Sequence, residues 1–211
     1  MNGKKILAKL DAYERLIRLD KPVGYMLLMW PTLWGLWMAA DGVPDIRLIF
    51  IFALGTVLMR SAGCAINDWA DRDFDSAVKR TAMRPVASGE ITGNEALWVG
   101  FVCVLAAAVM LVPLSWSARF WAIPAIAIAA AYPFTKRFIS IPQAILGVAF
   151  SMGIPMAFAA VRGEVPLVAF ALMLPIFSGC WPSTLNMRWW IATTTSASAL
   201  KPRHFFSDAL M

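Results

Sequence analysis

The chain has 211 residues, of which 60% are hydrophobic and only 15% are charged. An ordinary soluble domain carries about 25% charged residues, so the composition excludes a typical water-soluble protein and indicates a membrane protein. The formal net charge of +6 would also suit a nucleic-acid binder. The basic residues lie mainly in segments beside the predicted membrane spans, which explains the charge without a nucleic acid. No nucleic-acid partner is expected.

Apolar stretches of the length that crosses a bilayer follow one another along the chain. A membrane helix needs about 20 largely apolar residues, and six stretches meet this length closely: residues 22–40, 48–67, 97–114, 119–134, 141–161 and 166–184. One such stretch alone is compatible with a buried helix of a soluble protein. Six in succession predict an all-α, multi-span transmembrane bundle. No small-residue cleavage site follows the first stretch, so a removable signal peptide is not expected.

Basic residues alternate between the two sides of this predicted bundle. They gather before the first stretch, after the second and after the fourth, whereas the intervening loops carry only Arg47, Arg119 and Arg162. Because basic loops remain in the cytoplasm, we expect the N-terminus and the loops after the second and fourth stretches to be cytoplasmic, beside an anionic leaflet. The three cysteines lie in apolar stretches without the spacing of metal ligands, which is typical of small core residues.

A polar stripe ends the second stretch. Asn67, Asp71 and Asp75 are spaced i, i+4, i+8, so they share one face of a helix, and Arg60 precedes them on that face. Carboxylates this close repel one another, and a helix end near the bilayer needs a cation to hold them. Oxygen ligands suit Mg²⁺, which one or two carboxylates and a substrate's phosphates hold jointly. The stripe predicts half of a metal–diphosphate site; the alternative is a solvated helix end screened by Arg72.

Basic residues follow the stripe at once. Lys79, Arg80 and Arg84 come shortly after Asp75, and carboxylates for a metal beside cations for phosphate are the two halves of diphosphate recognition. The sequence has no Gly-rich phosphate-binding loop, so a nucleotide is not indicated. We therefore expect a lipid diphosphate at the mouth of the bundle, with Asp68 among the substrate-binding residues.

These residues resemble a known signature. This chain resembles the UbiA superfamily of intramembrane aromatic prenyltransferases in its first aspartate-rich signature, with every spacing kept. The residues that carry the resemblance are Asn67, Asp71, Phe74, Asp75, Val78, Arg80, Thr81, Arg84 and Gly89. Two further stretches, Arg18 to Gly24 and Tyr132 to Gly147, narrow the resemblance to the bacterial 4-hydroxybenzoate polyprenyltransferases of ubiquinone synthesis. The resemblance covers about residues 10–180.

The resemblance implies an architecture and a reaction. It implies a nine-span bundle, six spans of which are present here, in the bacterial inner membrane, with a central cavity open to the lipid. It also implies Mg²⁺, a polyprenyl diphosphate donor and 4-hydroxybenzoate as the acceptor, and it gives no reason to expect a protein partner. Departure of diphosphate leaves an allylic carbocation, and the metal with the basic residues would stabilise the departing group. The aromatic ring then attacks the cation.

The acceptor needs a cationic partner as well. A benzoate carries its carboxylate into a low-dielectric cavity, where an unpaired charge is costly. Lys136 and Arg137 are the candidates, and Arg137 is favoured for its bidentate fork; plain positive-inside topology would also explain both. Tyr132, one turn before Lys136, is assigned to the acceptor pocket or to the interfacial aromatic belt.

Arg137 gives a kinetic prediction. We expect Arg137→Ala in an intact enzyme to raise the KM for the acceptor far more than the KM for the donor, because only the acceptor carries a carboxylate to this side chain. Steady-state kinetics with each substrate varied in turn measure both constants. Equal increases in the two KM values would remove the assignment.

The C-terminal part departs from the superfamily pattern. A second aspartate-rich loop and three further helices would follow the sixth stretch, but the chain reads differently from Asn186 onward. Read one base early, the codon junction Trp189–Trp190 must encode valine and Trp190–Ile191 must encode aspartate. The neighbouring junctions permit the rest of Tyr-Ala-Met-Val-Asp-Arg-Asp-Asp-Asp.

This pattern predicts a frameshift near residues 179–180. Residues 1–184 would then be an incomplete prenyltransferase domain, residues 185–211 an out-of-frame tail, and the polypeptide as it stands would lack activity. Resequencing the coding DNA tests this hypothesis, since a clean frame with no alternative frame downstream refutes it.

Two other functions remain open at this point. One is a prenyltransferase of the same superfamily with another aromatic acceptor, such as homogentisate or a naphthoate, which acceptor competition would distinguish. The other is a non-catalytic transporter or scaffold, for which polar residues should line several spans. Here the polar residues gather at the ends predicted to be cytoplasmic.

Overall fold

The computed structural model describes residues 3–75, 81–135, 142–176 and 178. Within these residues every regular element is a helix and no strand occurs, which confirms the all-α prediction. The labelled helices are α1 (Gly3–Ile17), α2 (Val23–Ala40), α3 (Ile46–Ala70), α4 (Arg72–Asp75), α5 (Gly93–Leu111), α6 (Trp116–Thr135), α7 (Pro142–Ser151) and α8 (Gly153–Arg162). A further apolar helix covers Leu167–Ile176.

The six apolar stretches are mainly helical where the structure describes them, apart from residues at their ends and Met152. Among the residues that the structure describes, four segments are long and apolar enough to cross a membrane: α2, α3, α5 and the run Ile145–Arg162 through α7 and α8. The fourth predicted stretch forms α6, whose mean hydropathy is lowered by Arg119, Pro124 and Pro133. The sixth begins with the shorter helix at residues 167–176, and its remainder lies outside the described residues. The prediction of a multi-span helical bundle is confirmed.

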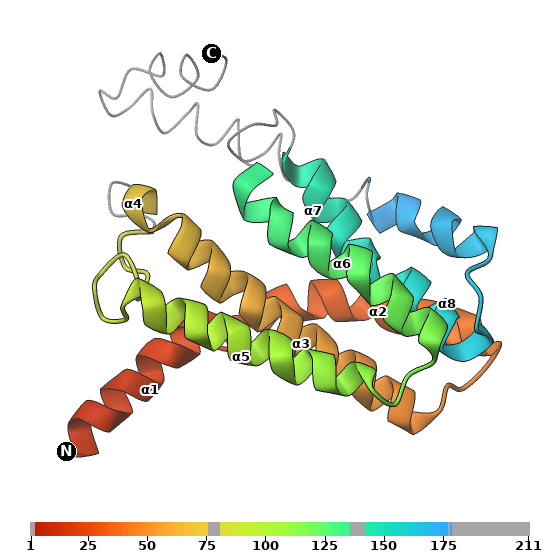
Figure 1. Ribbon diagram of the computed structural model, residues 1–211, viewed down its shortest axis with the longest axis horizontal. Helices are drawn as coiled ribbons and strands as arrows, with labels where there is room; N and C mark the ends of the chain where they lie inside the picture. Colours follow the sequence, from red (N-terminus) through yellow and green to blue (C-terminus); the bar gives the residue numbers. More distant parts are fainter. Residues whose placement is uncertain (1–2, 76–80, 136–141, 177, 179–211) are drawn as a thin grey trace, which may run out of the picture.

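The helices pack in pairs along the bundle. α3 packs mainly against α5 and α2 mainly against α8, while α6 lies against α7 and α8 (Figure 1). Small residues bring the backbones close: a Cβ added at Gly35 of α2 would lie 3.1 Å from the Ile154 Cα, and one at Gly100 of α5 would lie 3.1 Å from Ile66 Cγ1. Small residues are what close helix packing in a membrane requires.

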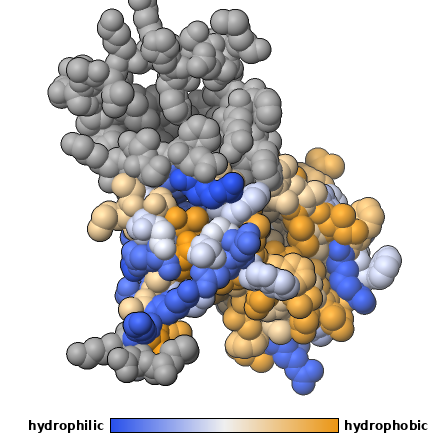
Figure 2. Space-filling view, turned by 60° about the vertical axis from the view of Figure 1, so that its left-hand side comes forward, coloured by the Kyte–Doolittle hydropathy of each residue, from blue (hydrophilic) through white to orange (hydrophobic). Residues whose placement is uncertain are grey.

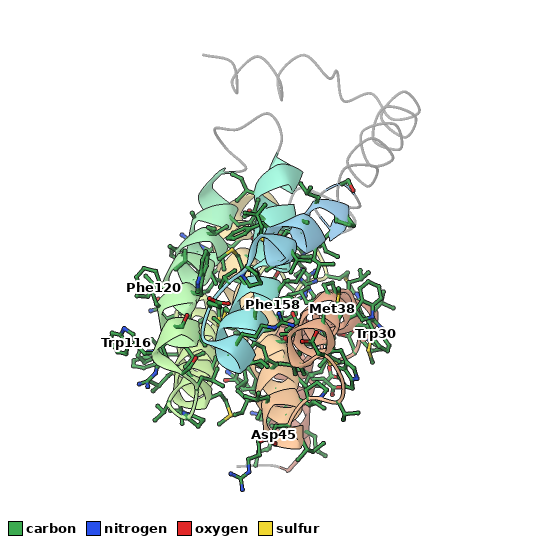
Figure 3. All side chains as sticks on the ribbon, turned by 90° about the vertical axis from the view of Figure 1, so that its right-hand side faces the viewer. Trp30, Met38, Asp45, Trp116, Phe120 and Phe158 are labelled. Atoms are coloured by element: carbon green, nitrogen blue, oxygen red, sulfur yellow. The ribbon has the colours of Figure 1, made fainter. Side chains whose placement is uncertain are left out.

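Large apolar side chains cover the outside of the bundle. Trp30, Trp116 and Phe120 project outward, whereas Phe158 lies in the interior and is 1% exposed (Figure 3). Hydrophilic residues gather instead at the end that carries α1 and α4, beside a mainly hydrophobic flank (Figure 2). An apolar flank with a polar end is the surface that a membrane-spanning bundle presents to lipid and water.

Candidate metal and diphosphate site

The polar stripe runs along one continuous helical path. The backbone N–H of Asp71 donates to the Asn67 carbonyl at 2.9 Å, and that of Asp75 donates to the Asp71 carbonyl at 2.9 Å. The helical path therefore continues from α3 into α4, and each side chain stands one turn beyond the previous one. This is the arrangement that the i, i+4, i+8 spacing predicts.

An apolar cavity begins where the stripe begins. It has a volume of about 240 Å³ and is lined by residues of α2, α3, α5, α6, α7 and α8. Its polar lining residues, apart from glycines and methionines, are Thr32, Thr56, Arg60, Asn67 and Tyr132. The α3 part of the wall runs from Ile51 to Asn67, about 24 Å at 1.5 Å per residue. A long apolar wall with a few polar groups suits a ligand with an apolar chain and a charged head.

Arg60, Asn67 and Tyr132 of the cavity wall lie toward one end. Arg60 and Asn67 belong to the C-terminal half of α3, and Tyr132 belongs to the C-terminal end of α6; these two helix ends face the same side of the molecule (Figure 1). Thr32 and Thr56 lie deeper, and their hydroxyls donate to the carbonyls of Leu28 at 3.0 Å and Phe52 at 2.7 Å. The deep part of the cavity is therefore chemically apolar.

Asp68 forms the centre of a buried ion network beside the stripe. Its side chain is 1% exposed, and its Oδ1 lies 3.2 Å from Arg18 Nη2 and 3.2 Å from Arg84 Nη1. The same Arg84 nitrogen donates to Asp75 Oδ2 at 2.6 Å. A carboxylate this buried is stable only when it is paired. Arg84 thus joins Asp68, inside the bundle, to Asp75 at the end of the stripe.

Asp68 therefore has different surroundings from those assigned to it from sequence. The wall of the cavity includes its neighbour Asn67 but not Asp68. Asp68 contacts Arg84 and holds this arginine in place. These contacts are typical of a residue that positions another side chain.

Arg18 is a member of the network that sequence reasoning did not identify as a site residue. It follows α1 in the left-handed conformation, with φ 60°, a position where helices usually carry glycine. The Leu19 N–H donates back to the Glu14 carbonyl at 3.1 Å, which closes the helix end. The left-handed backbone at Arg18 and its contact with Asp68 are visible only in the structure, and no local spacing in the sequence indicates them.

The loop after α4 returns to the stripe. Asp75 is 8% exposed, and the Thr81 hydroxyl donates to its backbone carbonyl at 2.9 Å. Asp71 is half-buried. The remaining predicted cations, Lys79, Arg80, Lys136 and Arg137, lie outside the described residues.

The oxygen donors of the stripe fit a metal ion that is also bound by a substrate better than an ion bound by the protein alone. Among the residues that the structure describes, no group of three Asp, Glu, His or Cys side chains is placed to hold a metal ion. Asn67, Asp71 and Asp75 nevertheless offer the oxygen ligands that Mg²⁺ prefers, and Mg²⁺ is often held by only one or two carboxylates together with a substrate's phosphates. The arrangement fits a cation whose other ligands come from a diphosphate.

The buried network gives a stability prediction. We expect Asp68→Ala to lower the free energy of unfolding by about 2–3 kcal/mol, because it removes the buried carboxylate that binds Arg18 and leaves Arg84 with only Asp75 of its two carboxylate partners. The matched control is Asp11→Ala, whose carboxylate also pairs with an arginine, Arg15, at 2.9 Å but is 65% exposed; we expect a change below about 0.5 kcal/mol. Thermal unfolding in detergent measures both, and equal shifts would contradict the network's role.

Comparison with known proteins places the chain in a family. Its fold and cavity define a multi-span membrane protein with an apolar chamber whose wall reaches Arg60 and the first residue of the polar stripe, Asn67. The model of the UbiA prenyltransferase family matches residues 28–188. The chain belongs to the UbiA prenyltransferase family, as its aspartate-rich stripe predicted.

Curated relatives carry a specific name. The chain is 59% identical over 167 residues to the 4-hydroxybenzoate octaprenyltransferase of Aromatoleum aromaticum, with 79% of this chain and 57% of that protein covered. It is 58% identical over 166 residues to the protein of the same name from Nitrosomonas europaea, with 79% and 57% covered. The chain therefore spans less than two thirds of the length of these relatives.

Solved structures share the fold. A UbiA homolog from Archaeoglobus fulgidus bound to GPP and Mg²⁺ superposes with a TM-score of 0.70 at 18% identity, over 82% of this chain and 62% of that one. A structure described as digeranylgeranylglyceryl phosphate synthase superposes with a TM-score of 0.69 at 21% identity, over 82% and 60%. At these identities the likeness establishes the arrangement of helices and nothing more specific.

Proposed function

We propose that this chain is part of an Mg²⁺-dependent prenyltransferase that moves a polyprenyl group from polyprenyl diphosphate to the ring of 4-hydroxybenzoate in ubiquinone synthesis. The observation that carries the proposal is the polar stripe of Asn67, Asp71 and Asp75 at one end of an apolar cavity. The names of the curated relatives support the reaction and the acceptor. The apolar helices and the basic N-terminal segment support an inner-membrane location with α4 on the cytoplasmic side.

The chain's own residues would divide the work on the donor. Asn67, Asp71 and Asp75 would hold Mg²⁺, which neutralises the charge that develops on diphosphate as it leaves. The apolar wall of the cavity would receive the prenyl chain and keep water from the allylic cation. Arg84, held by Asp68 and Asp75, would keep the end of the stripe in position.

Arg60 supplies a positive charge on the cavity wall. Among the described residues that line the cavity it is the one cation. Gly24 of α2 makes room for it, since a Cβ added there would lie 3.0 Å from Arg60 Nη2. We assign Arg60 to the diphosphate of the donor, because a fixed guanidinium beside an apolar chamber binds an anionic head group and leaves the chain in the apolar part.

The proposed binding site for the aromatic acceptor includes fewer residues that the structure describes. Tyr132 lies on the cavity wall, half-buried, which supports a place for the acceptor near the C-terminal end of α6. Lys136 and Arg137 stay proposals as partners of the benzoate carboxylate. The apolar depth of the cavity favours an enzyme for lipid diphosphates over a transporter, for which a polar path across the bundle would be needed.

Complementation tests the proposed function. A strain that lacks its own 4-hydroxybenzoate prenyltransferase would receive the gene as found, or the gene with one base corrected near codons 179–180. We expect ubiquinone from the corrected gene alone. Failure of the corrected protein, shown to be present in the membrane, would contradict the function, whereas ubiquinone from the uncorrected gene would contradict the predicted inactivity of the shorter product. Competition with homogentisate would separate the two acceptors.

A further inference from the structure

We propose that α1 lies in the headgroup region of the bilayer, at the end of the bundle that carries α4, and binds an anionic lipid surface through an apolar stripe. The proposal concerns the placement of this helix and does not depend on the catalytic function. α1 diverges from the bundle at this end (Figure 1). The hydrophilic character of the same end places it near the boundary between lipid and water (Figure 2).

One face of α1 is apolar and exposed. Ile6 is 42% exposed, Leu10 is 58% exposed and Leu7 is 68% exposed. Ile6 and Leu10 are one helical turn apart, and the half-buried Tyr13 and Ile17 continue this line toward α2. Side chains of this size facing water along most of a helix mark a surface that another apolar phase covers.

The adjacent face of α1 is attached to the bundle, which fixes the direction of the stripe. Ala12 and Leu16 are 2% and 0% exposed and share a buried cluster with Ala65, Ile91 and Ala96 of the α3–α5 region. Lys9 Nζ pairs with Glu95 Oε1 at 2.6 Å. Because α1 is packed in this way, the exposure of Ile6 and Leu10 does not come from a helix detached from the rest of the chain.

A second ion pair strengthens this attachment. Arg15 donates to both carboxylate oxygens of Glu90, which follows the loop after α4, and this guanidinium lowers the pKa of Glu90 below its ordinary value. Glu90, a carboxylate at physiological pH, holds Arg15 on the side of the helix toward the loop. Together with Arg18 at Asp68, this pair ties α1 to the same polypeptide segment that contains the stripe residues.

The charge of the segment identifies the occupant of the apolar face. Residues 3–21 contain six basic side chains against three acidic ones: Lys4, Lys5, Lys9, Arg15, Arg18 and Lys21 against Asp11, Glu14 and Asp20. Lys9, Arg15 and Arg18 pair with carboxylates of the bundle, so we assign the attraction to an anionic leaflet to Lys4 and Lys5 at the start of α1. α2, a membrane span, begins at Val23, six residues after α1 ends. The bilayer surface is thus the one apolar phase that must lie within reach of this helix.

Site-directed spin labels test the placement in the full chain. With the three native cysteines replaced by alanine, one cysteine is introduced as Leu10→Cys, or as Ala8→Cys for the control; Ala8 is also exposed but lies about 160° around the helix from Leu10. Each labelled protein is reconstituted into phosphatidylcholine vesicles with phosphatidylglycerol. We expect the label at position 10 to be several-fold less accessible to a water-soluble nickel complex than the label at position 8, and more accessible to oxygen.

Two further comparisons make the test decisive. Lys4→Gln with Lys5→Gln, or vesicles without phosphatidylglycerol, should raise nickel accessibility at position 10 toward that at position 8, because the electrostatic attraction is removed. Equal nickel accessibility at the two positions in anionic vesicles overturns the proposal. Spin–spin broadening at position 10 that disappears on dilution with unlabelled chain would instead assign the stripe to a second copy of the protein, and also overturns it.

Discussion

Replacing both Asp71 and Asp75 by alanine is expected to lower the rate of prenyl transfer by at least about 10²–10³-fold, the usual cost of removing a group that stabilises charge in the transition state. These carboxylates stand on successive turns beyond Asn67 of the cavity wall. Without them the diphosphate would have no divalent cation held against it when its bond to the prenyl chain breaks. The rate is measured in a chain extended in frame to the length of its relatives, with polyprenyl diphosphate and 4-hydroxybenzoate.

A matched control separates chemistry from folding in this experiment. Asp11→Ala with Glu14→Ala also removes two carboxylates at the same end of the molecule, both exposed on α1, and should leave the rate unchanged. Asp75 additionally binds Arg84 at 2.6 Å, so the unfolding temperature of each variant must be measured alongside. Full turnover by the Asp71 and Asp75 double variant, with normal folding of both proteins, would contradict the site.

Gly153→Ala is expected to destabilise the bundle by about 1–3 kcal/mol through overpacking. A Cβ at this position would lie 2.2 Å from Thr32 Oγ1 and 3.0 Å from Thr32 Cβ, where α8 begins against α2. The backbone of Gly153 is not in the left-handed region, so the expected cost comes from lack of space alone. Both residues line the cavity, and a forced shift here should also impair binding of a long prenyl chain.

Gly63→Ala is the matched control for this contact. Gly63 also lies in a membrane helix and lines the cavity, but a Cβ there would meet no atom within 4 Å. We expect this change to be neutral or to stabilise by up to about 1 kcal/mol, the helix propensity gained on replacing glycine. Thr32→Ala should recover part of the loss caused by Gly153→Ala, because it removes the nearest atom. Equal stability of the two glycine variants, measured by thermal unfolding in detergent, would contradict the packing account.

Local sequence patterns predicted the features that depend on the periodicity of a single helix. The apolar stretches fall on the observed helices because a segment in lipid must satisfy its backbone within itself. The stripe of Asn67, Asp71 and Asp75 followed from helical periodicity, and it occurs on one helical path as expected. Both features depend only on residues a turn or a span apart.

Contacts between distant segments were not visible in the sequence. The network of Arg18, Asp68 and Arg84 joins three segments, and nothing in local spacing shows that two arginines meet one buried carboxylate. α1 was not predicted as a helix because its apolar residues do not form a long run; charged residues of its other faces stand between them in the sequence. The break between α7 and α8 at Met152 was missed for a related reason, since the apolar run continues across it.

The central claim is that acidic side chains at the end of α3 grip a divalent cation, and that this cation holds the diphosphate of a prenyl donor. The most direct test is calorimetric binding of geranyl diphosphate to the in-frame extended chain, with Mg²⁺ or with a chelator, for the wild type and the Asp71→Ala, Asp75→Ala variant. The account predicts tight binding to the wild type in Mg²⁺ only, and weak binding in the other three cases. Binding of equal strength in chelator, or to the variant in Mg²⁺, would contradict it.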